Sequence, residues 1–268
     1  MLKDITLGQY FPGKSLIHRL DPRFKIIITL VYIVMLFVAS EFVSILPAVA
    51  FTVFILLAST IPLKLILRSL KPIVPIIIIT SIFNIFLYDG NTVLSLGIFE
   101  ITDKGIKITV LMALRIVLLI AGTSLLTYTT SPIMLTDGLE QLLSPLKKIK
   151  VPVHDLAMMM TIALRFIPTL IEETDKIVSA QKARGADLET GSVIQRAKAL
   201  VPVFIPLIVS AVRRAEELAL AMECRCYRGE EGRTRLRTLK TTGNDILAIF
   251  ISLLFLAAVV ALQIIAKK

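Results

Sequence analysis

Long uncharged stretches alternate with short charged ones along this chain, and their spacing predicts membrane-spanning helices. Charged side chains are rare or absent in segments 24–40, 42–62, 72–88, 105–128 and 243–268. Each segment approaches the length of about 20 residues with which an α-helix crosses a hydrocarbon core roughly 30 Å thick. The pattern therefore predicts an all-α integral membrane protein with about five transmembrane helices.

The stretch between the fourth and the last predicted span has a different character. Seventeen of the 30 Lys and Arg residues lie in 130–240, together with 13 of the 20 Asp and Glu residues. Loops rich in Lys and Arg stay on the cytoplasmic side of a membrane. We therefore expect a cytoplasmic N-terminus and three parts: a membrane domain (1–128), a cytoplasmic domain of amphipathic helices (129–242) and a C-terminal transmembrane helix (243–268).

A pattern occurs twice within the charged domain. Phe-Ile-Pro at 166–168 recurs 38 residues later at 204–206, and an amphipathic helical pattern follows each copy. The prolines predict a break near the start of each helix. Apolar runs at 156–164 and 199–212 are too short to span a bilayer, which favours interfacial or half-buried helices. Two such helices in one loop are expected to pack on each other.

Each copy carries an arginine near its helix end. The first copy ends in Ala183-Arg184-Gly185 and the second in Cys224-Arg225-Cys226. A glycine directly after a helix is typical of a C-cap, so an ordinary Arg-Gly helix end is the plainer interpretation of either copy. Arg228-Gly229 offers a competing register for the second copy.

A few charged residues within or beside the predicted spans are open to interpretation. Asp21-Pro22 predicts a helix start, because Asp caps and Pro suits the first helical position. Arg23 and Lys25 follow it, and long basic side chains at a span end are expected to snorkel to the interface. Arg115 lies deep in the fourth span, where it either faces protein or water, or snorkels outward. The segment 92–101 is compatible with a small hairpin.

The composition excludes several kinds of function. The mean hydropathy of +0.82 is too high for a soluble domain, and the net charge of +10 comes from basic residues interleaved with acidic ones. Without aromatic stacking residues among them, these charges do not predict nucleic-acid binding. The sequence lacks both glycine-rich phosphate-binding motifs. His18 and His154 predict local hydrogen bonds, so we expect no metal site, no cofactor and no catalytic residue.

Several motifs then carry a resemblance that covers nearly the whole chain. These are residues 8–15, 18–23, 129–132, 163–168, 183–185 and 221–229. Together and in this order they resemble the transmembrane (T) component of energy-coupling factor (ECF) transporters, the EcfT family. One departure is clear: the family's second signature is also Ala-Arg-Gly, whereas this chain has Cys224-Arg225-Cys226.

The resemblance implies a function. Such T components are non-catalytic scaffolds in the plasma membrane of prokaryotes. They join two cytoplasmic ATP-binding-cassette ATPase subunits, which bind the ATP, to a substrate-binding membrane (S) component. The complex imports a vitamin or a transition-metal ion. The ATPase-coupling residues it implies are Ala183, Arg184, Gly185, Cys224, Arg225 and Cys226, with Arg165, Arg228 and Gly229 as secondary candidates.

A different class of function stays open from the residues alone. A self-sufficient permease or membrane enzyme would work without partners and would need polar residues that converge within the spans. Arg115, Asn84 and a few Ser and Thr residues are available for that. Co-purification separates the two hypotheses, because a scaffold is expected to be isolated together with two nucleotide-binding subunits.

Overall fold

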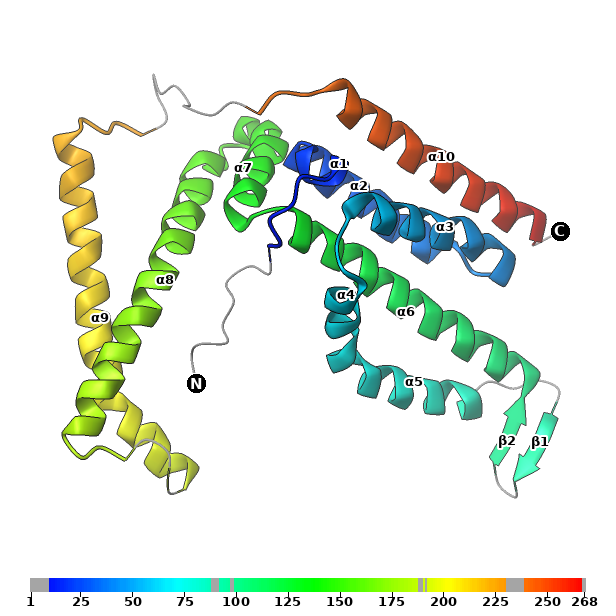
Figure 1. Cartoon of the computed structure of the whole chain (residues 1–268), viewed down its shortest axis with the longest axis horizontal. Helices are drawn as coiled ribbons and strands as arrows, with labels where there is room; N and C mark the ends of the chain where they lie inside the picture. The colour runs from blue at the N-terminus through cyan, green and yellow to red at the C-terminus, as the bar shows by residue number, and fades with distance from the viewer. Residues whose placement is uncertain are drawn as a thin grey trace. The chain divides into compact units, whose positions relative to one another are not determined.

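The computed structural model describes residues 10–87, 92–96, 99–187, 190, 192–229 and 239–266 (Figure 1). The helices are α1 (Leu16–Arg19), α2 (Pro22–Val38), α3 (Phe42–Ser59), α4 (Leu63–Leu70), α5 (Val74–Leu87), α6 (Asp103–Thr129), α7 (Pro132–Leu143), α8 (Val153–Ala183), α9 (Val193–Cys224) and α10 (Gly243–Ala266). Short 3-10 helices cover Lys71–Ile73 and Ser144–Ile149, and strands β1 (Thr92–Leu96) and β2 (Phe99–Thr102) form an antiparallel hairpin. The predictions of a helical protein and of this hairpin are confirmed.

Two compact units make up the chain. We call residues 8–138 with 239–268 the core unit, and residues 139–238 with 1–7 the α8–α9 unit. Helix α7 belongs to both, because the boundary falls between Gly138 and Leu139.

Six helical stretches of the described chain are long and apolar enough to cross a membrane, judged by length and composition. They are Phe42–Ser59, Leu63–Ile85, Asp103–Thr129, Val153–Ala183, Ile194–Cys224 and Gly243–Ala266. Helix α2, with 17 residues, also lies in a predicted span. The apolar runs at 156–164 and 199–212 were predicted to be too short to span a bilayer, but the helices that contain them are long and apolar enough to do so. Both runs lie inside continuous helices of 31 and 32 residues, because amphipathic sequence extends each run in both directions.

The third predicted span, 72–88, starts earlier than its apolar sequence indicates. Lys64, Arg68 and Lys71 lie between the second and third predicted spans, but the first two are on α4 and the third is on the 3-10 turn that leads into α5. Helix α4 is amphipathic: Ile66 is buried against α6, while Lys64 and Arg68 are exposed. The hydroxyl of Ser69 lies 2.6 Å from that of Tyr128, which ties α4 to α6.

Helices α2, α3, α6 and α10 form the centre of the core unit, and Figure 1 shows α10 alongside α2 and α3. Helix α10 runs parallel to α2, because Asp245 contacts Asp21 at one end and Gln263 contacts Ser40 at the other. The core between these ends is built from Tyr32, Met35, Leu36, Ala39, Ile45, Ala48, Phe51, Leu118 and Val259.

Tyr32 links three of these helices. Its hydroxyl donates to the Leu118 carbonyl at 2.7 Å and lies 2.8 Å from the Thr52 hydroxyl. The ring reaches α6 at Gly122, where an added Cβ would lie 2.1 Å from Tyr32 Cε1. Only glycine leaves room for this contact, so Gly122 fixes the distance between α2 and α6.

Arg115 faces protein, which resolves the two interpretations left open by the sequence. Its Nη2 donates to the Ala39 carbonyl at 2.5 Å, and Ala39 is the C-cap residue of α2. A cation at a helix C-terminus interacts favourably with the helix dipole. Gln263 holds the same end of the core unit, because its Oε1 accepts from the Ser40 N–H at 3.0 Å and from the Ser44 hydroxyl at 2.6 Å.

The start of α2 confirms one prediction and contradicts another. Asp21 caps the helix by accepting from the Arg23 N–H at 2.9 Å, and Pro22 occupies the first turn. Lys25 does not snorkel to the interface: it is only 4% exposed and its ammonium turns inward. Two of its three acceptors, on Thr129 and Thr130, lie more than 100 residues away in the sequence, which periodicity along α2 does not reveal.

Candidate functional site

The residues implicated in coupling lie on the two long helices of the α8–α9 unit or directly after the C-terminal ends of these helices. Helix α9 begins with a capping box, in which Ser192 accepts from the Gln195 N–H and the Gln195 side chain accepts from the Ser192 N–H at 2.9 Å. Such reciprocal bonds satisfy donors that a helix start otherwise leaves free. Helix α8 follows a short connection from α7, where His154 Nδ1 lies 2.9 Å from Glu140 Oε1.

The prolines do not break these helices, contrary to the prediction. Pro168 lies inside α8, and Pro202 and Pro206 lie inside α9. A proline removes one backbone hydrogen bond and bends a helix. Long amphipathic stretches on both sides still favour helix, so the loss of single hydrogen bonds does not end it.

Helices α8 and α9 form an antiparallel pair that crosses in Figure 1. The Gln181 side chain near the end of α8 donates to the Pro202 carbonyl near the start of α9, at 3.2 Å. Further along, Arg214 Nη2 donates to Glu173 Oε2 at 2.7 Å. The prediction that the two helices pack on each other is confirmed.

A Schellman motif closes α8 at the first signature. Arg184 is the C-cap, with φ −83° and ψ 4°, and Gly185 follows in the left-handed region with φ +85°. The Gly185 N–H donates to the Lys182 carbonyl at 3.0 Å and the Ala186 N–H to the Gln181 carbonyl at 3.0 Å. These are the two bonds that define the motif, and its left-handed position favours glycine.

The same motif closes α9 although no glycine is present. Arg225 is the C-cap, with φ −92° and ψ 12°, and Cys226 follows with φ +57°. The Cys226 N–H donates to the Glu223 carbonyl at 2.8 Å and the Tyr227 N–H to the Met222 carbonyl at 3.1 Å. Arg225 is therefore the geometric counterpart of Arg184, which favours Cys224-Arg225-Cys226 over the Arg228-Gly229 register.

The two arginines lie at opposite ends of the helix pair. Arg184 lies three residues after Gln181, whose side chain contacts the Pro202 carbonyl. Arg225 lies two residues before Tyr227, whose hydroxyl donates to the sulfur of Met158, near the start of α8, at 3.2 Å. From Pro202 to Arg225 helix α9 rises by about 35 Å at 1.5 Å per residue. Both arginines are exposed. The two arginines are thus presented to solvent at two separate places on the helix pair.

A groove accompanies the second arginine. Its volume is about 580 Å³, and Met158, Thr161, Ile162, Leu218, Met222, Arg225, Cys226, Tyr227, Arg228 and Gly229 line it. Methionine side chains adapt to differently shaped partners. Both secondary candidates after α9 thus lie beside Arg225, whereas Arg165 is exposed in the middle of α8, away from both signatures.

Metal-binding chemistry has little support in the described part of the chain. Among these residues, no three His, Cys, Asp or Glu side chains gather as a metal site would require. His18 accepts or donates locally, with Nδ1 2.6 Å from the Ser15 hydroxyl and Nε2 3.0 Å from the Phe11 carbonyl. That His18 and His154 make local hydrogen bonds is confirmed, and the absence of a cofactor stays a prediction.

We expect Cys226→Gly to stabilise the end of α9. A left-handed conformation costs a non-glycine residue about 1–2 kcal/mol, whereas glycine adds roughly 0.5–1 kcal/mol of backbone entropy cost. The melting temperature of the purified chain in detergent is therefore expected to rise or stay level. Cys224→Ala, inside the helix, is the matched control. A lower melting temperature for Cys226→Gly alone would mean that its thiol makes a stabilising contact.

Comparison with known proteins gives a consistent set of relatives. The model of the CbiQ family, described as a cobalt transport protein, matches residues 13–236. The "Energy-coupling factor transporter transmembrane protein EcfT" of Ruminiclostridium cellulolyticum is 52% identical over 263 residues, 98% of each chain. Proteins of the same name from Clostridium kluyveri and Bacillus subtilis are 55% and 47% identical, with at least 92% of each chain covered.

Proposed function

We infer a coupling role from one premise: this chain belongs to the CbiQ family, which includes the transmembrane T components of energy-coupling factor transporters. It is a multi-pass protein of the bacterial plasma membrane and a component of a transport system. We propose that it is a non-catalytic scaffold, which links two cytoplasmic ATPase subunits to a substrate-binding S component. In this proposal residues 129–242 lie in the cytoplasm, and the imported substrate is a vitamin or a transition-metal ion.

The observation that carries the proposal is the repeated arginine cap. Arg184 and Arg225 have nearly the same backbone conformation, stand at opposite ends of one antiparallel helix pair, and are exposed. A guanidinium at a helix end presents a rigid fork of donors to a carboxylate. Two equivalent arginines far apart suit two equivalent partners, and two ATPase subunits are such partners.

The second proposed partner is supported by the apolar face of α9. Val201, Phe204, Ile205, Ile208, Val209 and Val212 are each about half exposed. They recur at helical spacing and so form one continuous stripe. Exposed apolar patches of this kind mark contacts with protein or membrane. An S component, itself a membrane protein, fits this chemistry.

The alternative of a self-sufficient permease gains no support from the described core unit. Arg115, the most conspicuous polar residue in the spans, is committed to the Ala39 carbonyl. Its Nη1 lies 3.6 Å from the sulfur of Met112 rather than beside a second charged group. Arg115 therefore acts as a cap for α2 in the described structure.

Co-purification tests the proposal. We expect affinity-tagged chain, expressed with its ATPase and S subunits, to be isolated with two ATPase subunits. The chain purified alone is expected neither to bind nor to hydrolyse ATP, because no phosphate-binding loop is present in its sequence. ATP hydrolysis by a preparation free of ATPase subunits, or isolation without any ATPase under mild detergent conditions, would contradict the scaffold role.

A further inference from the structure

A buried polar cluster surrounds the first turn of α2. Asp245, only 1% exposed, accepts from the Asp21 N–H at 2.8 Å. It also accepts from the Thr242 N–H and the Thr242 hydroxyl, each at 2.7 Å. The Asp21 carboxylate in turn accepts from the Arg23 guanidinium, with Nη2 at 2.7 Å. The turn that starts α2 is thus tied to the turn that starts α10.

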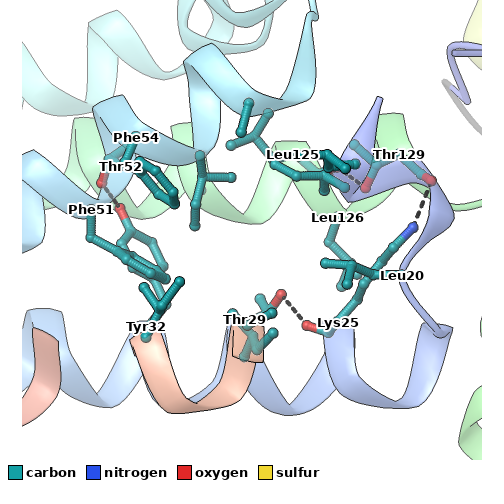
Figure 2. A pocket seen from close by; sticks show the side chains of 18 of the residues that line it. Leu20, Lys25, Thr29, Tyr32, Phe51, Thr52, Phe54, Leu125, Leu126 and Thr129 are labelled. Carbon is teal, nitrogen blue, oxygen red and sulfur yellow. Dashed lines mark hydrogen bonds between the residues drawn. The ribbon is translucent and has the colours of Figure 1, made fainter. Parts of the chain in front are cut away.

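Lys25 ties the same turn of α2 to the end of α6. Its ammonium donates to the Thr129 carbonyl at 3.0 Å, to the Thr130 hydroxyl at 3.2 Å and to the His18 carbonyl at 3.3 Å. Figure 2 shows the ammonium pointing to Thr129 at the edge of an apolar cavity of about 220 Å³. A buried ammonium needs all its donors satisfied, so the two bonds to Thr129 and Thr130 hold the α6–α7 corner against α2.

Helix α7 touches this turn as well. A Cβ added at Gly138 would lie 3.0 Å from Pro22 Cβ and 3.3 Å from the Arg23 nitrogen. The hydrogen at this position therefore allows α7 to approach the α2 backbone closely. Gly138 is the last residue of the core unit before the chain enters the α8–α9 unit.

These contacts have one feature in common. Among the residues that the structure describes, the chain passes between the units twice, between Gly138 and Leu139 and between Gly229 and Leu239. One connection follows Thr129, Thr130 and Gly138, and the other leads into Thr242 and Asp245. Both are fixed to the same turn of α2 within the core unit. We call Asp21, Arg23, Lys25, Thr130, Gly138 and Asp245 the hub.

We infer that Lys25 and Asp245 are positioning residues for energy coupling. This inference rests on the proposed function. The hub fixes both connections to one turn of α2. When the α8–α9 unit is displaced, α2, α6 and α10 are therefore expected to move together as one rigid body. Without the hub, the two connections can move independently and the displacement is absorbed by local distortion. Removing the Lys25 ammonium leaves the Thr129 and His18 carbonyls without this donor, and changing Asp245 weakens the acceptor of the Asp21 N–H and of Thr242.

The opposite end of the same helices provides a matched control. There Gln263 of α10 bonds to Ser40 and Ser44, but no connection to the other unit leaves from that end. Gln263→Met removes one exposed and one partly buried hydrogen bond of α10, as Asp245→Asn and Lys25→Met remove hydrogen bonds at the hub. A purely structural role predicts similar effects at both ends, whereas a coupling role predicts an effect at the hub alone.

The experiment uses the assembled complex in proteoliposomes. Spin labels are attached through a ketone-bearing unnatural amino acid that replaces Glu172 on α8 and Leu254 on α10, both exposed, so that the coupling candidates Cys224 and Cys226 stay unchanged. The label distance is measured without nucleotide and after trapping with ATP and vanadate, alongside the rate of ATP hydrolysis. We expect a nucleotide-dependent shift in the complex without further changes and in Gln263→Met. Lys25→Met and Asp245→Asn are expected to hydrolyse ATP but to lose most of that shift.

Each outcome of this experiment either supports or overturns the inference. A full shift in both hub variants, or an equal loss in Gln263→Met, would overturn the inference. A complex that binds both ATPases but shows no shift without further changes would also overturn it, leaving the scaffold role intact. A chain that binds no ATPase would instead remove the proposed function. If neither hub variant accumulates, Gly138→Ala, which crowds Pro22 and the Arg23 backbone nitrogen, takes their place with the same expected loss.

Discussion

We expect the double substitution Arg184→Glu and Arg225→Glu to abolish assembly with both ATPase subunits. Truncating one partner of a desolvated interfacial charge pair costs about 2–5 kcal/mol, or roughly 30-fold to several thousand-fold in affinity. Charge reversal adds repulsion from the carboxylate that the arginine is proposed to meet. Each single substitution is expected to weaken binding, because the two caps lie at opposite ends of the helix pair. Pull-down of the ATPase subunits with tagged chain measures the effect.

The double substitution Lys176→Glu and Arg213→Glu is the matched control. Both residues are exposed on the same two helices and the net charge changes equally, but neither residue caps a helix. Arg184→Lys tests the fork geometry, because an ammonium keeps the charge but loses the paired donors. Normal assembly in the double Arg→Glu variant would show that both arginines are ordinary helix caps. Loss of that variant from the membrane, with the control retained, would make them structural.

The sequence predicted the apolar helices well because each is specified locally. Segment 42–62 contains no charge after Glu41, and α3 covers Phe42–Ser59. The start of α2 was also predictable, since Asp21 and Pro22 are both local signals for the first turn. Basic residues, in contrast, were poor markers of helix ends: α4 includes Lys64 and Arg68, because a basic amphipathic helix is as compatible with them as a loop.

The register of the second arginine could not be decided from sequence. Glycine is the usual residue in the left-handed position after a helix, which made Arg228-Gly229 a credible alternative. The backbone instead places Cys226 in that position and repeats the hydrogen bonds found after Arg184. The residues that flank the two arginines differ, so comparing residue types does not locate a motif that is defined by its backbone geometry.

The hub was invisible to the sequence for a different reason. Lys25 and Thr130 are 105 residues apart and Asp21 and Asp245 are 224 apart, so neither pair produces a periodic pattern. Each residue considered alone has a plainer explanation: a basic side chain near a membrane surface, or a carboxylate at a helix start. Only the packing of α2 against α6 and α10 brings them together. Glu173 and Arg214, 41 residues apart, are likewise brought together only by the packing of α8 against α9.

We expect charge reversal at the crossing of α8 and α9 to disturb the helix pair. Arg214 and Glu173 are about two-thirds buried, with exposed side-chain fractions of 35% and 27%. A hydrogen bond between charged groups contributes about 1.5–3 kcal/mol when it is partly shielded from water. Arg214→Glu replaces the 2.7 Å pair with two facing carboxylates. We therefore expect a lower melting temperature and weaker coupling of ATP hydrolysis to the label shift described above.

The reciprocal variant, Glu173→Arg with Arg214→Glu, is expected to recover most of both losses, because it restores opposite charges across the same crossing. The neighbouring exposed residue supplies the control: Arg213 forms no ion pair within the described chain, so Arg213→Glu is expected to change little. This rescue separates the pair from the net charge of α9, which a single reversal changes as well. If the reciprocal variant is no better than Arg214→Glu, then another contact, such as that between Gln181 and the Pro202 carbonyl, holds the two helices at their crossing.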